Sequence, residues 1–407
     1  MPTSPPPGRW TDVARATGLL GADDAVAQTI FAEMTSLAAR TGAINLGQGF
    51  PDVDGPEFIR SAAKDAIDAG RNQYAPGDGA PELRRAIADH QRRHYGLDVD
   101  PDSQVLVTTG ATEAIAAALL ALVGQGDEVI TLEPFYDSHA AGIALAGATH
   151  VPVPLTADDF RLDAAALRAA VTPRTRLIVL NTPHNPTGTV LTRVELEQVA
   201  AVARDADLLV LTDEVYEHLV FDDATHVPIA TLPGMGERTL TVSSSGKTFS
   251  LTGWKVGWVH GPAGLVTAVR TVKQFVTYTS GAPFQPAIAQ ALDDDAAPRA
   301  LAASLASRRD LLCEGLTAAG LDVVVPQGTY FVVADGQHLA ERLGVADGHE
   351  LSRRLPELAG VVGIPVSAFC RTGSPTASAL AARVRFTFVK REDVLREAVE
   401  RLHRLPR

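Results

Sequence analysis

Short apolar runs, separated in several places by longer stretches of helical pattern, constrain the fold of this chain most. They are rich in Val, Ile and Leu and lie at residues 105–108, 129–132, 177–180, 208–212, 239–242 and 256–260. Such runs are expected for strands buried on both faces. Helical patterns at 113–123 and 194–203 predict an α/β fold with a mainly parallel sheet covered by helices. The last two runs, with no long helix between them, are expected to form a hairpin or an antiparallel pair.

The length of the chain, 407 residues, favours two domains, because a single hydrophobic core stops growing well below this size. We expect a disordered leader at 1–28, which begins with a cluster of prolines. Residues 53–290 are expected to form a large α/β domain. Residues 291–407 are expected to form a smaller α+β domain, which the N-terminal segment 29–52 joins.

Composition argues against several classes of protein. No stretch approaches the roughly 20 apolar residues of a membrane span, so no membrane partner is expected. A net charge of -12 without a compensating basic block argues against nucleic acid as a partner. Cys313 and Cys370 cannot form a disulfide framework and lack metal-ligand spacing with histidine. We therefore expect a cytoplasmic protein without a metal at its active site.

Polar residues that follow the apolar runs are the candidates for a ligand site, because ligands of open parallel sheets bind beyond the carboxyl ends of the strands. Gly110, Ala111 and Thr112 follow the first run and open a helix, where free backbone N–H groups favour an anion such as phosphate. An ordinary N-cap remains the alternative. Tyr136 follows the second run and could lie over a planar ring, or simply belong to the core.

The segment Asn-Thr-Pro-His-Asn-Pro-Thr-Gly at 181–188 has two prolines and a glycine that restrict it to a rigid path. It can hold the Asn185 amide at a fixed point, although a turn without function is equally compatible. Asp213 ends the next run, and a buried carboxylate there needs a positive partner such as a pyridinium nitrogen. Tyr216 could reach an oxygen on the same ring, whereas Glu214 is expected to be solvated.

Lys247 lies among hydroxyls and glycine in the segment 243–258, which is the most specific in the chain. An amine must be unprotonated to form a Schiff base, and Lys255 could supply nearby positive charge or bind phosphate. A P-loop is excluded because the glycine it requires is replaced by Thr241. Arg385 lies between apolar neighbours in a strand-like run and could bind a carboxylate. A structural ion pair or a solvent-facing position is the alternative.

Six segments together resemble the class I aminotransferases of pyridoxal-phosphate (PLP) fold type I. The similarity is greatest to the branch that contains kynurenine aminotransferase, glutamine transaminase K and methionine aminotransferase, and to actinobacterial N-succinyldiaminopimelate aminotransferases. It extends from about residue 29 to residue 402, which covers nearly all of the chain. The segments that carry it are 45–52, 72–79, 181–188, 212–217, 243–258 and 384–390.

This resemblance implies a fold with a seven-stranded type of sheet, a PLP cofactor and a homodimer with shared active sites. It makes Lys247 the Schiff-base lysine, pairs Asp213 with the ring nitrogen, directs Tyr216 and Asn185 to the ring oxygen, and stacks Tyr136 on the ring. The residues implied to hold the phosphate are Gly110, Ala111, Thr112, Ser244, Lys255 and, from the other subunit, Tyr74. The residues implied to contact the substrate are Arg385, Asn185, Gly49, Phe31 and, across the dimer interface, Tyr278.

The implied activity is transfer of the α-amino group of an L-amino acid to a 2-oxo acid. Phe31 favours an aromatic, sulfur-containing, kynurenine or glutamine donor. N-succinyl-LL-diaminopimelate is the alternative donor, and β-elimination from cysteine conjugates is an alternative reaction. A regulatory PLP-fold protein is not expected, because only about 28 residues precede the matching region, too few for a DNA-binding domain.

Overall fold

The computed structural model describes residues 8–20 and 26–405. Its centre is a seven-stranded sheet in the order β2-β8-β7-β6-β5-β3-β4. All neighbours are parallel except β8, which is antiparallel to both β2 and β7. The strands are β2 (Val105–Thr109), β3 (Glu128–Glu133), β4 (Thr149–Pro154), β5 (Thr175–Asn181), β6 (Leu209–Asp213), β7 (Thr239–Ser244) and β8 (Val256–His260). The predicted α/β class, and the antiparallel pairing of the last two runs, are therefore confirmed.

Both faces of this sheet are buried under helices, because successive apolar residues of each strand point to opposite sides. On β5, Leu177 and Val179 pack with α5, α6 and α10, whereas Ile178 and Leu180 pack with α8. At the β2–β8 end, the second face is covered by α3, α4 and α11. The bounds are α3 (Glu57–Asp68), α4 (Pro81–Tyr95), α5 (Gly110–Leu122), α6 (Asp137–Ala146), α7 (Ala164–Ala169), α8 (Arg193–Asp205), α9 (Ser245–Thr248), α10 (Ala263–Lys273) and α11 (Phe284–Ala291).

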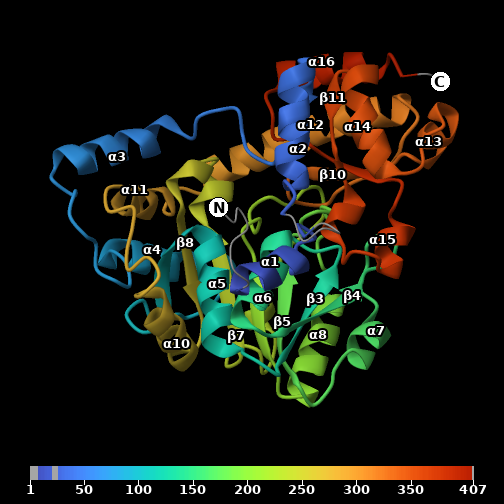
Figure 1. The fold of residues 1–407 in the computed structure, drawn as a ribbon. Helices are drawn as coiled ribbons and strands as arrows, with labels where there is room; N and C mark the ends of the chain where they lie inside the picture. The colour runs from blue at the N-terminus through green and yellow to red at the C-terminus, as the bar shows by residue number, and fades with distance from the viewer. Residues whose placement is uncertain (1–7, 21–25, 406–407) are drawn as a thin grey trace, which may run out of the picture.

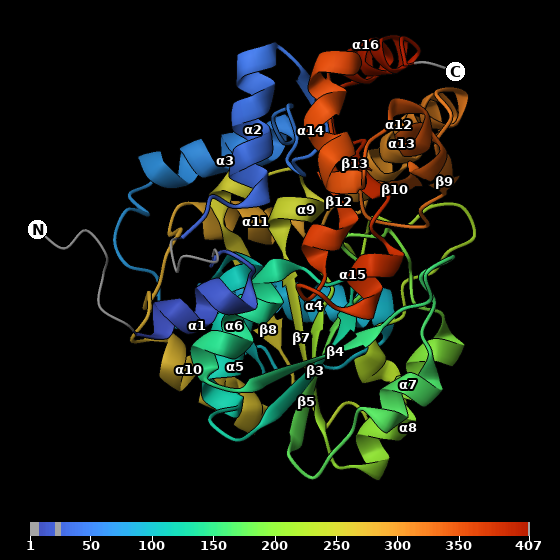
Figure 2. The ribbon, with the colours of Figure 1, turned by 45° about the vertical axis from the view of Figure 1, so that its right-hand side comes forward.

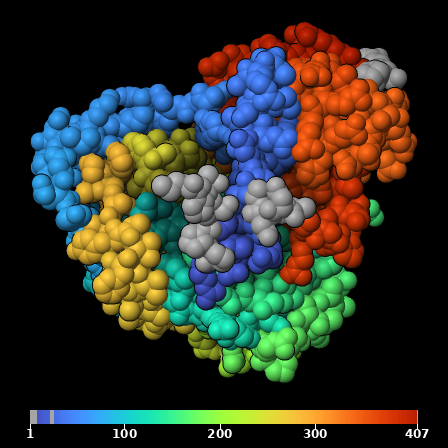
Figure 3. Space-filling model, in the orientation of Figure 1, coloured from blue at the N-terminus to red at the C-terminus, as the bar shows by residue number. Residues whose placement is uncertain are grey.

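A second body of structure contains a four-stranded antiparallel sheet, in the order β12-β13-β10-β9, and the helices around it. Figure 3 shows it in orange and red above the large domain, with α2 in front. Its elements are β9 (Asp322–Val324), β10 (Phe331–Asp335), β12 (Ile364–Pro365), β13 (Arg383–Thr387), α12 (Ala296–Ala318), α13 (Gln337–Leu343), α14 (Gly348–Leu358), α15 (Pro375–Ala379) and α16 (Glu392–Leu402).

The N-terminal region packs on this second body. Helix α2 (Ile30–Thr41) buries Met34 and Ala38 against Val362, Ile364 and Phe369. Strand β1 (Ile44–Asn45) pairs in parallel with β11 (Val361–Val362). The domain boundaries at 52 and 290 remain predictions.

Residues 9–16 differ from the expected disordered leader. They form helix α1 (Arg9–Ala16), which buries Ala14 and lies beside α6 in both ribbon views (Figures 1 and 2). The alternation of polar residues with Trp10, Val13 and Ala14 supplies one apolar side for this contact. The proline-rich positions 1–7 lie outside the described residues.

Strand β4 was not expected from the sequence, because prolines occupy two of its six positions, Pro152 and Pro154. Proline is tolerated on an edge strand, and β4 is the edge of the sheet, paired only with β3.

In the described part of the chain, no helix combines the length and the apolar character needed to cross a membrane.

Candidate active site

A cavity of about 360 Å³ opens at the carboxyl ends of the central strands. Asn181, Asp213 and Ser244 are the last residues of β5, β6 and β7, and all three side chains line it. The second body of structure contributes Arg385 from β13 and Phe331 from β10. The predicted site residues that the cavity brings together are Phe31, Gly49, Gly110, Ala111, Thr112, Tyr136, Asn185, Asp213, Tyr216, Ser244, Lys247, Lys255 and Arg385.

Asp213 is 4% exposed and is held by groups on two sides. His139 Nε2, from α6, lies 3.3 Å from Asp213 Oδ2. The Asn181 amide donates to the Asp213 backbone carbonyl at 2.9 Å, and its Oδ1 accepts from the Asn185 backbone N–H at 2.8 Å. Asn181 therefore fixes both Asp213 and the loop that carries Asn185. The apolar runs of the sequence predict no role for His139, and none of its own for Asn181.

Lys247 lies on the short helix α9, directly after β7. Its Nζ donates to the Tyr330 hydroxyl at 2.9 Å, and that hydroxyl donates to the Gly49 carbonyl at 2.6 Å. The amine also lies 5.9 Å from the centre of the Tyr216 ring. Tyr330, which directly precedes β10, was not predicted from the sequence. It connects the amine to the segment that carries Gly49.

The start of α5 provides the anion-binding geometry that the sequence predicts. Gly110 begins the helix with φ +73°, a left-handed conformation that favours glycine. Lys255 lies over it, since a Cβ built on Gly110 would be 3.2 Å from Lys255 Nζ. The backbone N–H groups of the first helical turn have no partner within the helix, so the helix end and the ammonium together favour a phosphate. The residues present thus fit the phosphate of PLP.

Arg385 is 2% exposed, yet in the described part of the chain no carboxylate forms an ion pair with it. Its two terminal nitrogens donate to Asn185 Oδ1 and the Gly47 carbonyl, each at 2.9 Å. Its guanidinium lies 3.9 Å from the centre of the Phe331 ring, and Nε has no partner among the described residues. A structural ion pair and a solvent-facing position are both excluded. The arrangement leaves a buried cation ready for an anion.

Burial shifts the acid–base behaviour of several groups that line the cavity. It lowers the pKa of Arg385 to about 10, so the guanidinium stays charged at neutral pH. It raises the pKa of Tyr216 well above its ordinary value, with Tyr330 adding to the effect. The pKa of Tyr136 is raised for the same reason. Both phenols therefore keep their protons and can donate a hydrogen bond to a ligand oxygen.

Tyr74 and Tyr278 do not line this cavity. Their rings lie 5.7 Å apart, and Tyr74 is 83% exposed. Their predicted roles concern the site of the other subunit, so one chain does not test them.

Glu214 is not solvated, contrary to the expectation from the sequence. It is 1% exposed, and Oε2 lies 2.9 Å from His226 Nε2. Thr212 donates to its other oxygen at 3.0 Å. Burial raises the pKa of Glu214, which His226 opposes. His226, twelve residues later, is the partner that accompanies this buried carboxylate.

Comparisons with known proteins agree with this geometry. The family model for aminotransferase class I and II matches residues 41–402. A probable N-succinyldiaminopimelate aminotransferase of Mycobacterium tuberculosis is 56% identical over 383 residues, which are 92% of this chain and 96% of that protein. Methionine aminotransferase of Escherichia coli is 40% identical, over 93% of this chain and 96% of its own length.

The solved structure of N-succinyldiaminopimelate aminotransferase from M. tuberculosis superimposes with a TM-score of 0.89 at 55% identity. The superposition covers 93% of this chain and 98% of that one. A buried acid, an amine and an anion-binding helix end meet in one cavity, and the matching family covers most of the sequence. The chain belongs to the class I and II aminotransferases, enzymes that depend on PLP.

Proposed function

We propose that this aminotransferase moves an amino group between N-succinyldiaminopimelate and a 2-oxo acid. The observation that carries the proposal is the 56% identity with the M. tuberculosis protein of that name, against 40% with methionine aminotransferase. Both alignments cover more than nine-tenths of this chain, so they differ in similarity and not in extent. This proposal replaces the preference for an aromatic, sulfur-containing, kynurenine or glutamine donor, and retains the alternative donor considered from the sequence.

The cavity supports a substrate with an amide in its side chain. Gln48 lines it beside Phe31, and the Gln48 Nε2 donates to Thr35 Oγ1 at 2.5 Å. This bond directs the Gln48 amide and leaves its Oε1 available for the amide N–H of a succinyl group. Among the described residues that line the cavity, Arg385 is the sole arginine, and it is assigned to the α-carboxylate. N-succinyldiaminopimelate carries further carboxylates, as aspartate does, so the wall supports this donor through the amide contact alone.

PLP supplies an electron-withdrawing ring and an aldehyde carbon that carries the amino group between the two substrates. In our proposal, Lys247 Nζ is the residue that would hold that carbon when PLP is bound. Asp213 Oδ2 keeps a proton on the ring nitrogen, with His139 orienting the carboxylate. Tyr216 and Asn185 address the ring oxygen, and Tyr136 covers one face. Gly110, Ala111, Thr112, Ser244 and Lys255 hold the phosphate.

The same residues position and deprotonate the substrate. Arg385 and Asn185 bind the α-carboxylate together with the Gly49 backbone, while Phe31 contacts the side chain. When it is not bound to the cofactor, Lys247 Nζ would take the proton from the substrate Cα carbon and return it to the cofactor's aldehyde carbon. Tyr330, 2.9 Å from this amine, holds it near the reacting carbon. Only the chemistry of the side chain distinguishes one donor from another.

We further propose a cytoplasmic homodimer with shared sites. Tyr74 and Tyr278 are large side chains with 83% and 47% of their surface exposed in one chain. A partner subunit would cover both side chains. Tyr74 of this chain would then contribute to the phosphate site of the partner. Sedimentation of the PLP-loaded protein at twice the mass of the 42.9 kDa chain would support this, and a monomer would contradict it.

A panel of amino donors tests the proposed substrate. The PLP-loaded enzyme is incubated with 2-oxoglutarate and one donor, and glutamate formation is followed. We expect kcat/KM for N-succinyl-LL-diaminopimelate to exceed that for methionine, kynurenine, phenylalanine, glutamine and aspartate by at least about tenfold, which corresponds to about 1.4 kcal/mol. A higher value for methionine or kynurenine would overturn the assignment of substrate and leave the aminotransferase activity intact.

A further inference from the structure

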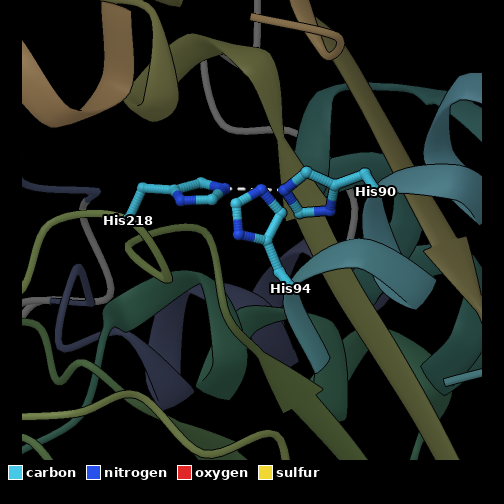
Figure 4. A group of neighbouring side chains, drawn as sticks. All are labelled: His90, His94 and His218. Atoms are coloured by element: carbon cyan, nitrogen blue, oxygen red, sulfur yellow. Dashed lines mark hydrogen bonds between the residues drawn. The ribbon is translucent and has the colours of Figure 1, made fainter. Parts of the chain in front are cut away.

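Three histidines converge on the large domain outside the active-site cavity. His90 and His94 lie four residues apart on α4, which places both rings on one side of the helix. His218 follows Tyr216 by two residues and reaches them from the other side (Figure 4). One nitrogen of each ring lies within 4.8 Å of the others, and the Nε2 atoms of His90 and His218 are 2.7 Å apart.

We propose that these three imidazoles form a binding site for a divalent transition-metal cation such as Zn²⁺. Three neutral imidazoles suit zinc, copper or nickel and disfavour calcium or magnesium, which prefer oxygen ligands. Three protein ligands leave a fourth position for water. None of the three histidines lines the active-site cavity. Their His-x-x-x-His spacing on α4 was not recognised from the sequence.

The distances require only a small adjustment. Zinc bonds imidazole nitrogen at about 2.0–2.1 Å, so two nitrogens on a tetrahedral cation lie about 3.3 Å apart. The His90 and His218 nitrogens must therefore separate by about half an ångström. The third ring, His94, is the most accessible, with 25% of its side chain exposed. It gives the cation a route from solvent.

Neighbouring side chains hold the rings in place. Asp295 Oδ1 lies 3.1 Å from His94 Nε2, and Arg93 donates to the same oxygen at 3.2 Å. The Gln91 amide nitrogen lies 3.2 Å from His90 Nδ1, while Gln91 Oε1 has no partner among the described residues. A half-turn of this amide would let Oε1 accept a proton from Nδ1. The His90 Nε2 lone pair would then face the cation, as ligand histidines require.

The contact between His90 and His218 also indicates how a cation could take the place of a proton. Two neutral imidazoles 2.7 Å apart can share one proton, which is the arrangement without metal. A cation replaces that proton, which passes to a ring nitrogen that faces away. Because the ring keeps this proton on its other nitrogen, binding of the cation releases no net proton.

Equilibrium dialysis of the PLP-loaded protein, stripped of metal with a chelator, tests the proposal with Zn²⁺ as the probe. We expect the wild type to bind one zinc per subunit that folded His94→Ala does not bind, with micromolar or tighter affinity. His94→Ala should lower zinc affinity about 100-fold or more, because a direct ligand matters at least as much as its supporting groups. Gln91→Leu, which removes the acceptor for His90, should lower zinc affinity about tenfold.

The matched control is His338→Ala, which removes an exposed histidine from another part of the surface. It should bind zinc as the wild type does. Because His94 is partly exposed, its variant is expected to fold, which circular dichroism and the PLP absorbance verify. Equal zinc binding by the wild type and folded His94→Ala would overturn the proposal. So would failure of the wild type to bind one equivalent at a zinc concentration about 100 times the expected micromolar dissociation constant. Neither result bears on the choice of amino donor.

Discussion

Arg385→Lys tests the proposed recognition of the substrate carboxylate. The guanidinium donates to Asn185 and the Gly47 carbonyl and still has an unpartnered Nε. Lysine would keep the positive charge but lose the planar fork that binds a carboxylate through two parallel bonds. It would also lose the flat contact with the Phe331 ring, 3.9 Å away.

The expected loss follows from one charge-assisted hydrogen bond. Such a bond contributes about 1.5–3 kcal/mol, and lysine can replace only one of the two that arginine offers. This loss corresponds to a roughly 10- to 150-fold decrease in kcat/KM. Because every amino donor carries the same α-carboxylate, we expect a similar factor for each donor.

Steady-state kinetics with two donors of different side chain measure the effect. The control is Arg383→Lys, on the same strand, where the arginine pairs with Asp335 at 3.2 Å and does not line the cavity. It should leave kcat/KM within about twofold of wild type. If Arg385→Lys were equally harmless, or harmed only one donor, the carboxylate role of Arg385 would be refuted.

Three further changes have defined outcomes. Asp213→Asn should lower kcat about 100- to 1,000-fold in the same assay, because the amide cannot hold a charged ring nitrogen, and an unchanged kcat would exclude that role. Gly257→Ala places a Cβ 2.5 Å from the Gly110 carbonyl carbon, so the dissociation constant of PLP should rise about tenfold or more. Gly253→Ala is the control, because no atom lies within 4 Å of the added Cβ, and it should leave this dissociation constant unchanged. His184→Asn should reduce the loss of stability in acid, because burial lowers the pKa of His184 to about 3. Between pH 6.5 and 3 the unfolded chain therefore binds one more proton than the folded chain. The free energy of unfolding decreases by about 1.4 kcal/mol for each unit by which the pH is lowered in this range. Thermal melts at pH 7.5 and 5 should show a smaller decrease in Tm for His184→Asn than for wild type, and an equal decrease would contradict the argument.

The central strands could be predicted from the sequence because both of their faces are buried. That burial requires nearly continuous apolar runs, and the runs end where polar side chains meet the cavity. Asp213 is a candidate because it stands at such an end, and Lys247 because hydroxyls and glycine surround it in the sequence. Edge strand β4 and helix α1 lack such a signal, because each of them fully buries a single residue, Val153 and Ala14.

The residues that were missed act through contacts between distant parts of the chain. Tyr330 is 83 residues from Lys247, and no local pattern connects them. His139 reaches Asp213 from a helix 74 residues earlier. Glu214 was misjudged because His226, its partner, comes from a later segment. Hydrophobic periodicity predicts where a strand lies but does not predict which polar groups will meet.

The central claim is that PLP is attached to Lys247 Nζ, and borohydride reduction tests it most directly. The yellow, PLP-loaded enzyme is reduced, digested and mapped by mass spectrometry. We predict that the pyridoxyl group is found on the peptide that contains Lys247, and that Lys255 is unmodified. Labelling of Lys255 instead, or a colourless protein that takes up no PLP, would contradict the account.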